Sequence, residues 1–392
     1  MKNSFLMLAS VMFLTKSHLQ AQNNLKSLEI SGYVSSMQTT MFTHIDSAWM
    51  TENLIHQRLN VKWYATPDLT MAVEVRNRFI FGEFVKNIPG YDRLIDREQG
   101  WWDLSGYILS GNSFLLHSTI DRGWIDYTRG NWQIRAGRQR INWGVNYAWN
   151  PNDLFNTYSF FDFDYPEKPG SDALRIQYYT GVSSMVEAAV KVNAREQITA
   201  AGKWKFNRWN YDFQLIGGLI NDEDVAAGAG WSGNIAGAGF RGEVTYLHPV
   251  EHFTDTSGIL IASVGADYTF PGSLYLQAEI LYNGAEIPVG GFEQYYYMPL
   301  SVKNLSFTDW SFLLGATYPV TPLFQAGTHL MMFPSIKGWF AGPTLNYSLG
   351  DNLHFSFATQ HFSGHFDTPV PGGGRKEKKQ LTLGYLRFKY SF

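Results

Sequence analysis

The last twelve residues of the chain, residues 381–392, read LTLGYLRFKYSF, and this stretch decides the fold class. Counting back from the terminus, one face carries Phe392, Tyr390, Phe388, Leu386 and Gly384, and the other carries Ser391, Lys389, Arg387 and Tyr385. A repeat of two is that of a β-strand, because successive side chains of a strand point to opposite faces. The aromatic face is too apolar to face water. The stretch therefore predicts either a membrane strand or an amphipathic edge strand of a soluble sandwich.

The composition favours the membrane strand. The chain has 16% aromatic residues, 37 glycines and only 17% charged residues, and no segment after the N-terminus is long and apolar enough for a membrane helix. Such a composition is typical of a membrane β-barrel, in which lipid-facing and lumen-facing residues alternate. The net charge of −3 argues against nucleic acid as a partner. There is no cysteine, so we expect neither a lipoprotein anchor nor disulfides.

The N-terminus is typical of an export signal. Lys2 is followed by an apolar run over residues 5–14 and by the small residue Ala21. The run is shorter than the roughly 20 residues that a membrane-spanning helix needs. We therefore predict a signal peptide over residues 1–21, cleaved after Ala21, and a single barrel domain over residues 22–392 without an internal linker.

Segments of about ten residues alternate between apolar and polar positions along the mature chain. One segment places Met71, Val73 and Val75 on one face, with Glu74 and Arg76 on the other. Tight turns are predicted near residues 65–68, 129–131, 181–183, 207–208, 233–234, 271–272, 319–322 and 350–352. Longer, more polar connections are predicted at residues 82–120, 141–171, 248–257, 284–306 and 363–378.

These segments predict an all-β fold, a closed antiparallel transmembrane β-barrel of about 18 strands, within a range of 16 to 18. Roughly ten residues per tilted strand is the length that a bilayer requires. The barrel must close because lipid satisfies no unpaired strand edge. The alternation of short and long connections predicts short periplasmic turns and long external loops.

The face opposite the apolar one should line the lumen, and its charges divide into two walls. The basic wall consists of Arg58, Lys62, Arg76, Arg78, Arg122, Arg135 and Arg175. The facing wall is mildly acidic and contains Asp212, Glu243, Asp267 and Glu279. Walls of charge inside a pore set which solutes pass, so the pattern predicts a preference for anions. Alternatively, the charges pair across neighbouring strands and fill a plugged lumen.

The alternation breaks after Gly137, because Arg138 and Arg140 would face lipid if it continued. Either the strand has left the membrane there, or a bulge at Gly137 redirects both arginines. The following loop of about 30 residues is so aromatic that we expect it to pack against the barrel mouth or inside the lumen. The residues of this predicted constriction loop are Arg138, Arg140, Asn150, Asn152 and Asp153.

Residues 137–144 (GRQRINWG) and 150–156 (NPNDLFN), together with the aromatic C-terminal strand, resemble a porin-like family of outer-membrane β-barrels of Gram-negative bacteria. In that family the insertion machinery reads the last strand, which then pairs with the first. The resemblance implies a pore or solute channel integral to the cell outer membrane. The expected partners are outer-membrane lipid, the insertion machinery and small polar solutes, with an oligomer possible and no cofactor or metal. The substrates of the family are diverse, so no ligand carries over.

The sequence thus predicts a channel for passive passage of small polar, anionic solutes. The alternative is a plugged barrel that acts as a scaffold or as an assembly or export component for surface polymers. His354 and Ser356 share one strand face, with His361 and His365 beyond, and this spacing is geometrically compatible with nucleophilic catalysis. Inward His and Ser residues more often simply line a lumen, so we expect no enzyme.

Overall fold

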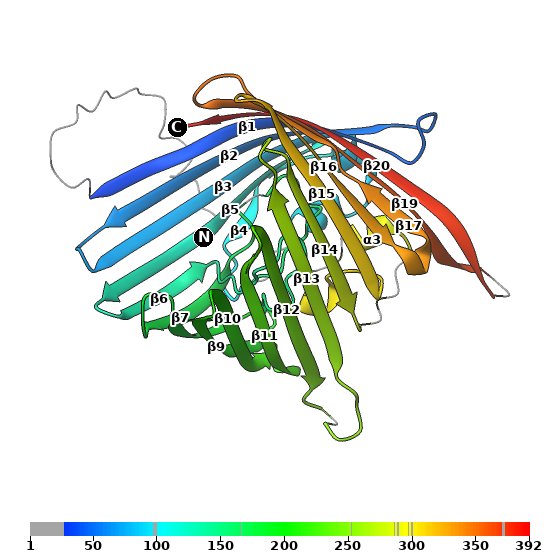
Figure 1. Ribbon diagram of the computed structural model, residues 1–392. Helices are drawn as coiled ribbons and strands as arrows, with labels where there is room; N and C mark the ends of the chain where they lie inside the picture. Colours follow the sequence, from blue (N-terminus) through cyan, green and yellow to red (C-terminus); the bar gives the residue numbers. More distant parts are fainter. Residues whose placement is uncertain are drawn as a thin grey trace.

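The computed structural model is a closed β-barrel, with segments of the chain folded inside it (Figure 1). The structure describes residues 27–96, 100–165, 167–251, 253–285, 287, 290–296, 298, 301–370 and 373–392. The predicted signal peptide, residues 1–21, lies outside the described residues.

Twenty strands form one antiparallel sheet. The first ten are β1 (Leu28–Phe42), β2 (Met50–Tyr64), β3 (Leu69–Gly82), β4 (Ser105–Ser110), β5 (Phe114–Arg129), β6 (Trp132–Gln139), β7 (Ser171–Tyr179), β8 (Met185–Val192), β9 (Ile198–Arg208) and β10 (Tyr211–Ile220). The others are β11 (Asp224–Ile235), β12 (Ala238–Pro249), β13 (Ile259–Thr269), β14 (Tyr275–Asn283), β15 (Trp310–Thr321), β16 (Phe324–Phe333), β17 (Gly338–Ala341), β18 (Thr344–Ser348), β19 (Leu353–Val370) and β20 (Gly373–Ser391).

These twenty strands occupy eighteen barrel positions. β17 and β18 are two parts of one position, since both pair with β16 on one side and with β19 on the other. β4 and β6 also share a position, because they pair with the first and second halves of β5. The predicted closed antiparallel barrel of 16 to 18 strands is therefore confirmed at its upper limit.

The first and last strands close the barrel. β1 pairs with β20 from Tyr33 opposite Ser391 to Phe42 opposite Thr382. The backbone N–H of Phe392 donates to the carbonyl of Gly32 at 3.0 Å, and the N–H of Gly32 donates back at 2.9 Å. No strand edge is left unpaired at the seam, which is the condition for placing a sheet in lipid.

The outward faces of the strands are apolar. Val73, Leu174, Leu215 and Leu314 are exposed, although each belongs to a regular strand. The inward faces carry buried polar and charged residues instead. This inversion of the usual soluble pattern is typical of a barrel with lipid outside and a polar lumen inside.

The two ends of the barrel differ in their connections. At the end that holds the C-terminus, which we call the turn end, the connections are short, for example residues 130–131 and 236–237. At the other end, the loop end, residues 83–104, 140–170 and 284–309 form long connections, although residues 193–197 and 221–223 are short. The predicted loop over residues 363–378 was wrong, because most of it belongs to the β19–β20 hairpin.

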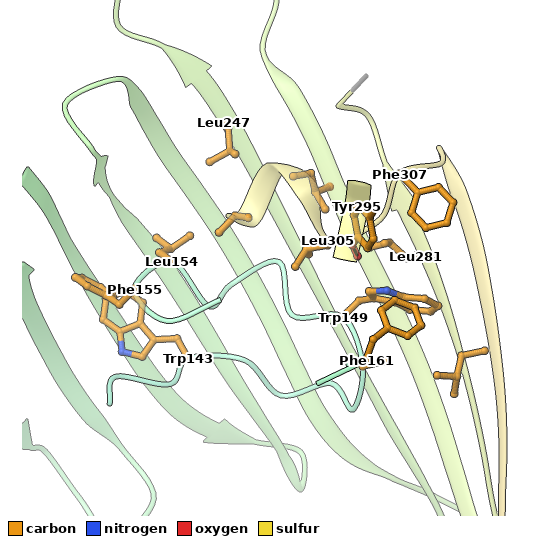
Figure 2. Packing of buried hydrophobic residues seen from close by; sticks show 14 of the residues in the cluster. Trp143, Trp149, Leu154, Phe155, Phe161, Leu247, Leu281, Tyr295, Leu305 and Phe307 are labelled. Carbon is orange, nitrogen blue, oxygen red and sulfur yellow. Dashed lines mark hydrogen bonds between the residues drawn. The ribbon is translucent and has the colours of Figure 1, made fainter. Parts of the chain in front are cut away.

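Helical structure is confined to the loop end. It comprises α1 (Glu83–Asn87), α2 (Tyr91–Ile95), α3 (Phe292–Tyr296) and the 3₁₀ turns η2 (Val302–Asn304) and η3 (Pro334–Ile336). Among the described residues, no helix has the length and hydropathy to cross a membrane. Buried apolar side chains from the 140–170 and 284–309 connections pack together inside the barrel (Figure 2).

Candidate functional site: the lumen and the loop that crosses it

Residues 140–170, which we call the crossing loop, run from β6 across the lumen and back to β7. Trp143, Trp149, Phe155 and Phe161 of this loop are all buried. Figure 2 shows these side chains inside the curve of the strands rather than above the rim. A loop buried in this way must find hydrogen-bond partners for its backbone, since water does not reach it.

Two carboxylates of the acidic wall supply those partners. Glu243 of β12 accepts the backbone N–H of Val145, of Asn146 at 3.0 Å and of Asn152 at 2.8 Å. Both carboxylate oxygens are used, and the side chain is almost fully buried. Glu243 therefore holds the crossing loop and offers little charge to a passing solute.

Glu279 of β14 holds residues 147–149 of the crossing loop in the same way. Its oxygens accept the N–H of Tyr147 at 3.1 Å, of Ala148 at 2.9 Å and of Trp149 at 2.8 Å. The Ser263 hydroxyl donates to the same carboxylate at 2.9 Å. Together, Glu243 and Glu279 accept six backbone N–H groups of the loop. Hydrogen bonds to a carboxylate are stronger than those to a neutral acceptor.

Side chains from neighbouring strands complete the attachment. The Thr245 hydroxyl donates to Asn152 Oδ1 at 2.7 Å, and Asn152 Nδ2 donates to the carbonyl of Ala229 at 3.0 Å. Trp143 Nε1 donates to Glu187 Oε1 of β8 at 2.9 Å. The sequence places Glu187, Glu243 and Glu279 on inward faces, but it gave no sign that they hold a loop.

The loop is also organised by its own Asn and Asp side chains. Asn150 Oδ1 accepts the N–H of Asn146 at 3.0 Å, and Asp153 Oδ1 accepts the N–H of Trp143 at 3.3 Å. Asp153 is buried, and burial raises the pKa of its carboxyl to about 7, against the opposing charge of Arg140. Short polar side chains that bond nearby backbone are the usual means of fixing an irregular loop.

The returning part of the loop lies against the basic wall, across the lumen from Glu243. Its contacts are Tyr165 OH to Asp121, His56 Nδ1 to Asp164 at 3.3 Å, Tyr33 OH to Glu167 Oε2 at 3.3 Å, and Arg387 Nη1 to the carbonyl of Phe163 at 3.2 Å. The crossing loop thus touches both walls and divides the lumen.

Most cations of the basic wall already have partners. Arg58 of β2 is almost fully buried and forms ion pairs with Glu74 and, at 2.6 Å, with Asp121. Arg135 pairs with Asp126 at 2.7 Å. A cation paired in this way contributes little to the field along a solute path.

The remaining predicted wall residues vary in their surroundings. Arg122 Nη2 donates to the loop carbonyls of Glu167 at 3.0 Å and Lys168 at 2.6 Å, so it is another anchor of the loop. Lys62 Nζ lies 4.8 Å from the Tyr64 ring centroid. Arg175 has a buried Nε without a hydrogen-bond partner in the described part of the chain.

Arg76 and Arg78 of β3 line a cavity of about 470 Å³, whose wall also includes parts of the crossing loop, of β1, β2, β5 and β20 and of the connection between β14 and β15. The Arg76 guanidinium lies 3.9 Å from the Tyr165 ring centroid, and Arg78 Nη2 donates to the carbonyl of Ile95 at 3.0 Å. Among the described residues, Arg76 Nε and Nη1 and Arg78 Nε have no hydrogen-bond partner. A buried N–H group without a partner carries an unpaid desolvation cost, which an added acceptor would offset.

The cavity wall is not uniformly basic. Asp121, Asp162 and Asp164 also line it, and an apolar side is formed by Met37 and Leu383. Asp121 and Asp164 are engaged with Arg58 and His56. A solute in this space therefore meets basic, acidic and apolar side chains.

The break in alternation at Gly137 corresponds to a real change in the backbone. Gly137 has a φ of 114°, and a Cβ there would lie 2.2 Å from the carbonyl oxygen of Gly123, so only glycine fits. Arg138 is buried and forms a bidentate pair with Asp172 at 2.7 and 2.8 Å. Arg140 lies beyond the end of β6, where it donates to Asn142 Oδ1 at 3.0 Å. Neither arginine is exposed on the outer face.

A second segment, residues 284–309, packs in the lumen beside the crossing loop. Tyr295 OH donates to the carbonyl of Leu305 at 2.8 Å and fixes the fold of the segment. The Phe161 ring lies 5.1 Å from that of Phe292 and 5.0 Å from that of Phe340, both edge-on. The sequence predicted only a polar connection here and missed this aromatic cluster.

The residues weighed for catalysis do not form a nucleophile and base pair. The Ser356 hydroxyl donates to Asn346 Oδ1 at 2.8 Å rather than to a histidine. His361 Nδ1 contacts the Thr382 hydroxyl at 2.9 Å. Among the described residues there is also no group of three or more His, Asp or Glu side chains that could hold a metal ion.

The geometry defines a class: a closed 18-stranded barrel whose lumen is crossed by an inward loop. Solved structures share this fold. OccK8 (OprE) of Pseudomonas aeruginosa has a TM-score of 0.59 at 10% identity, covering 94% of this chain and 98% of that one. OccK11 (OpdR) of the same organism has a TM-score of 0.58 at 8% identity, covering 94% and 96%. OccAB1 of Acinetobacter baumannii has a TM-score of 0.55 at 11% identity, covering 94% and 97%.

At these identities the likeness shows the fold alone. No protein-family model and no curated protein matches the sequence.

Proposed function

We propose that this protein is an outer-membrane channel for passive passage of small polar solutes, with a preference for anions. The observation that carries the proposal is the cavity beside Arg76 and Arg78, whose guanidinium N–H groups keep free hydrogen-bonding capacity. The closed sheet and its apolar outer face support insertion in a bilayer. The crossing loop is the constriction of the channel.

The preference for anions follows from how the two walls use their charges. The carboxylates of Glu243 and Glu279 bind the crossing loop, so they are withdrawn from the solute path. Arg76 and Arg78 remain at the cavity surface. In a narrow path with low-dielectric walls, a few fixed charges dominate the local potential.

Export and assembly belong to the same proposal. The N-terminal segment directs export, and the insertion machinery of the outer membrane recognises the aromatic last strand. The pairing of Phe392 with Gly32 at the seam supports a role of the C-terminus in closing the barrel. Removing Phe392 should lower the amount of inserted protein without blocking export.

A second function, a plugged scaffold for surface polymers, is favoured by the extent of packing inside the lumen. Residues 284–309 and the crossing loop bury Phe161, Phe292 and Tyr295 against the barrel wall. In this second function, the packed lumen would pass no solute. The two functions differ in a single measurable property, conductance.

Planar-bilayer recording of the purified protein tests the proposal. Discrete conductance steps and a reversal potential that shows anion preference in a salt gradient are expected. Absence of steps from a protein with heat-modifiable gel migration and β-type circular dichroism would favour the scaffold. Cation preference would contradict the assigned role of Arg76 and Arg78.

A further inference from the structure

The apolar outer surface is interrupted on one side of the barrel. The outward residues of β3 include Val73, Val75, Phe79 and Phe81, but Asn77 lies between them. On the neighbouring strand β2, Gln57 is the register partner of Asn77. Asn77 Nδ2 donates to Gln57 Oε1 at 2.5 Å. An amide pair therefore faces outward in the middle of the apolar surface.

The interruption extends over the adjacent strand β1. Ser36 and Gln38 are both exposed, and Gln38 lies opposite Asn53 of β2. These outward residues form what we call the amide patch: Ser36, Gln38, Thr40, Asn53, Gln57 and Asn77. The patch is uncharged, and it adjoins the seam where β1 pairs with β20.

The amide patch cannot be explained as surface above the bilayer. Ile55 lies beyond Gln57 on β2, and Phe79 and Phe81 lie beyond Asn77 on β3, so apolar residues continue on both sides. The outward faces of β10, β13, β14 and β15, all fully described, carry no amide or charged side chain. Compared with these four strands, β1, β2 and β3 depart from the pattern.

The amides of the patch have unused hydrogen-bonding groups. Within the described part of the chain, Gln38 has no side-chain hydrogen bond, and Gln57 Nε2 and Asn77 Oδ1 have no partner. Hydrocarbon offers neither donors nor acceptors, so such groups are costly when they face lipid. Polar side chains between membrane segments are instead satisfied by another protein segment.

We propose that the amide patch is a dimer interface, occupied by the same patch of a second copy of this chain. Amide side chains donate and accept equally, so a two-fold axis can set the N–H groups of one copy against the carbonyl groups of the other. The patch has no charge that would select an oppositely charged partner. One patch per barrel makes a closed two-fold dimer, whereas a larger ring requires two different patches. The inference rests on insertion of the barrel in a membrane, but not on conductance.

The absence of cysteine from the sequence makes the interface directly testable. Gln38→Cys and Gln57→Cys each place a single thiol in the patch. Leu215→Cys and Leu276→Cys place one on β10 and β14, on outward faces without amides. A short bismaleimide is added to isolated outer membranes that contain each variant. A band of twice the chain mass is expected for the two patch variants and not for the two controls.

A second variant tests whether the amide side chains cause dimerisation. The double variant Gln57→Leu with Asn77→Leu replaces two amides of the patch by apolar side chains. In mild detergent, the mass of this variant, measured by light scattering, should be that of a monomer, whereas the native protein should have the mass of a dimer. Retained heat-modifiable migration shows that the barrel still folds and inserts, which separates this result from a failure of the channel proposal. Absence of a cross-linked dimer in the patch variants, a ladder above the dimer, or cross-linking to a different protein would each overturn the proposal.

Discussion

The two walls of the lumen carry charges on equivalent inward positions, yet they use them differently. On the β12–β14 wall, the carboxylates of Glu243 and Glu279 accept hydrogen bonds from six backbone N–H groups of the crossing loop. On the β3 wall, Arg76 and Arg78 line a cavity and keep N–H groups without a hydrogen-bond partner in the described part of the chain. An inward charge therefore shows which way a side chain points, but not whether a solute can meet it.

The difference has a simple physical cause. The crossing loop has almost no regular secondary structure, so its buried backbone N–H groups require acceptors from elsewhere. Carboxylates are acceptors only, and each can take several N–H groups at once, whereas guanidinium groups can only donate. Glu243 and Glu279 therefore anchor loop N–H groups. An arginine can anchor only loop carbonyls, as Arg122 does, and in the described part of the chain Arg76 and Arg78 form no such hydrogen bond.

Deleting residues 146–166 should produce the largest effect, because it removes the part of the loop that bridges both walls. An 18-stranded barrel without an inward loop has room for an aqueous channel, so we expect conductance to rise about twofold or more. Single-channel recording measures the change. Unchanged conductance in a heat-modifiable barrel would show that the constriction lies elsewhere, with the 284–309 segment as the next candidate.

Replacing the anchors should give a smaller change in the same direction. Glu243→Ala with Glu279→Ala leaves five of the six loop N–H groups without partners, because that of Asn146 also donates to Asn150 Oδ1. Each orphaned group costs about 1 kcal/mol or more if it stays buried. We expect the loop to detach part of the time and conductance to lie between that of the native chain and the deletion. Limited proteolysis of the loop should become faster in parallel.

Asp267→Ala is the matched control for the anchors. Asp267 lies on the same acidic wall, but its carboxylate pairs with Arg241 rather than with the loop. This variant should keep native conductance and native resistance to protease. If it opened the channel as much as the loss of Glu243 and Glu279, wall charge rather than loop attachment would be the cause.

On the opposite wall, Arg76→Gln with Arg78→Gln should weaken anion preference while changing total conductance little. Each substitution removes one fixed positive charge from the cavity surface, and the permeability ratio should fall by about two- to threefold. Reversal potentials in a salt gradient give the ratio. Arg135→Gln is the control, because Arg135 pairs with Asp126 and does not line the cavity. An equal fall in the control would mean that no particular arginine sets the preference.

The barrel could be predicted from sequence because its determinants are local. A period of two and tight turns such as residues 271–272 fix strands and hairpins without knowledge of distant residues. The same rule failed for residues 363–378, where glycine, proline and lysine resemble a loop although the chain continues as a hairpin. The break in alternation predicted a change at Gly137, but the backbone geometry of that change could not be predicted from the sequence.

The roles within the lumen could not be predicted, because the partners are backbone groups distant in sequence. Nothing near Glu243 indicates that it accepts the N–H of Asn152, which is 91 residues away. Arg58 and Arg76 differ because Asp121 and Glu74 pair with Arg58. Arg76 has no carboxylate partner among the described residues. The sequence predicts which side chains point into the lumen, whereas packing decides which of their charges remain available to a solute.

The smallest expected effect is a pH dependence of channel opening. It arises from Asp153, which is buried within the crossing loop. Burial raises the pKa of its carboxyl to about 7, above the value near 3.8 that it has when the loop is released. The packed loop therefore holds a proton more tightly than the released loop. The contribution of Asp153 to the stability of the packed loop is fully present below about pH 4 and decreases as the pH rises towards 7. Above about pH 7 it stays at its lowest value. Rare opening events should become more frequent between about pH 4 and about pH 7, by at most about tenfold per pH unit, with little change in mean conductance.

Asp153→Asn keeps an oxygen to accept the N–H of Trp143 and removes the titration. The difference between the two pH profiles isolates the ionisation of Asp153 from that of other groups. The charges of Arg140, Lys168 and Lys191, which act on its carboxyl, are present in both proteins. Counting openings in single-channel records from pH 4 to pH 8 makes the comparison. A shallower profile in the variant is expected. Identical profiles would mean that Asp153 ionises without loosening the loop, and that the anchors on the acidic wall alone set how firmly it is held.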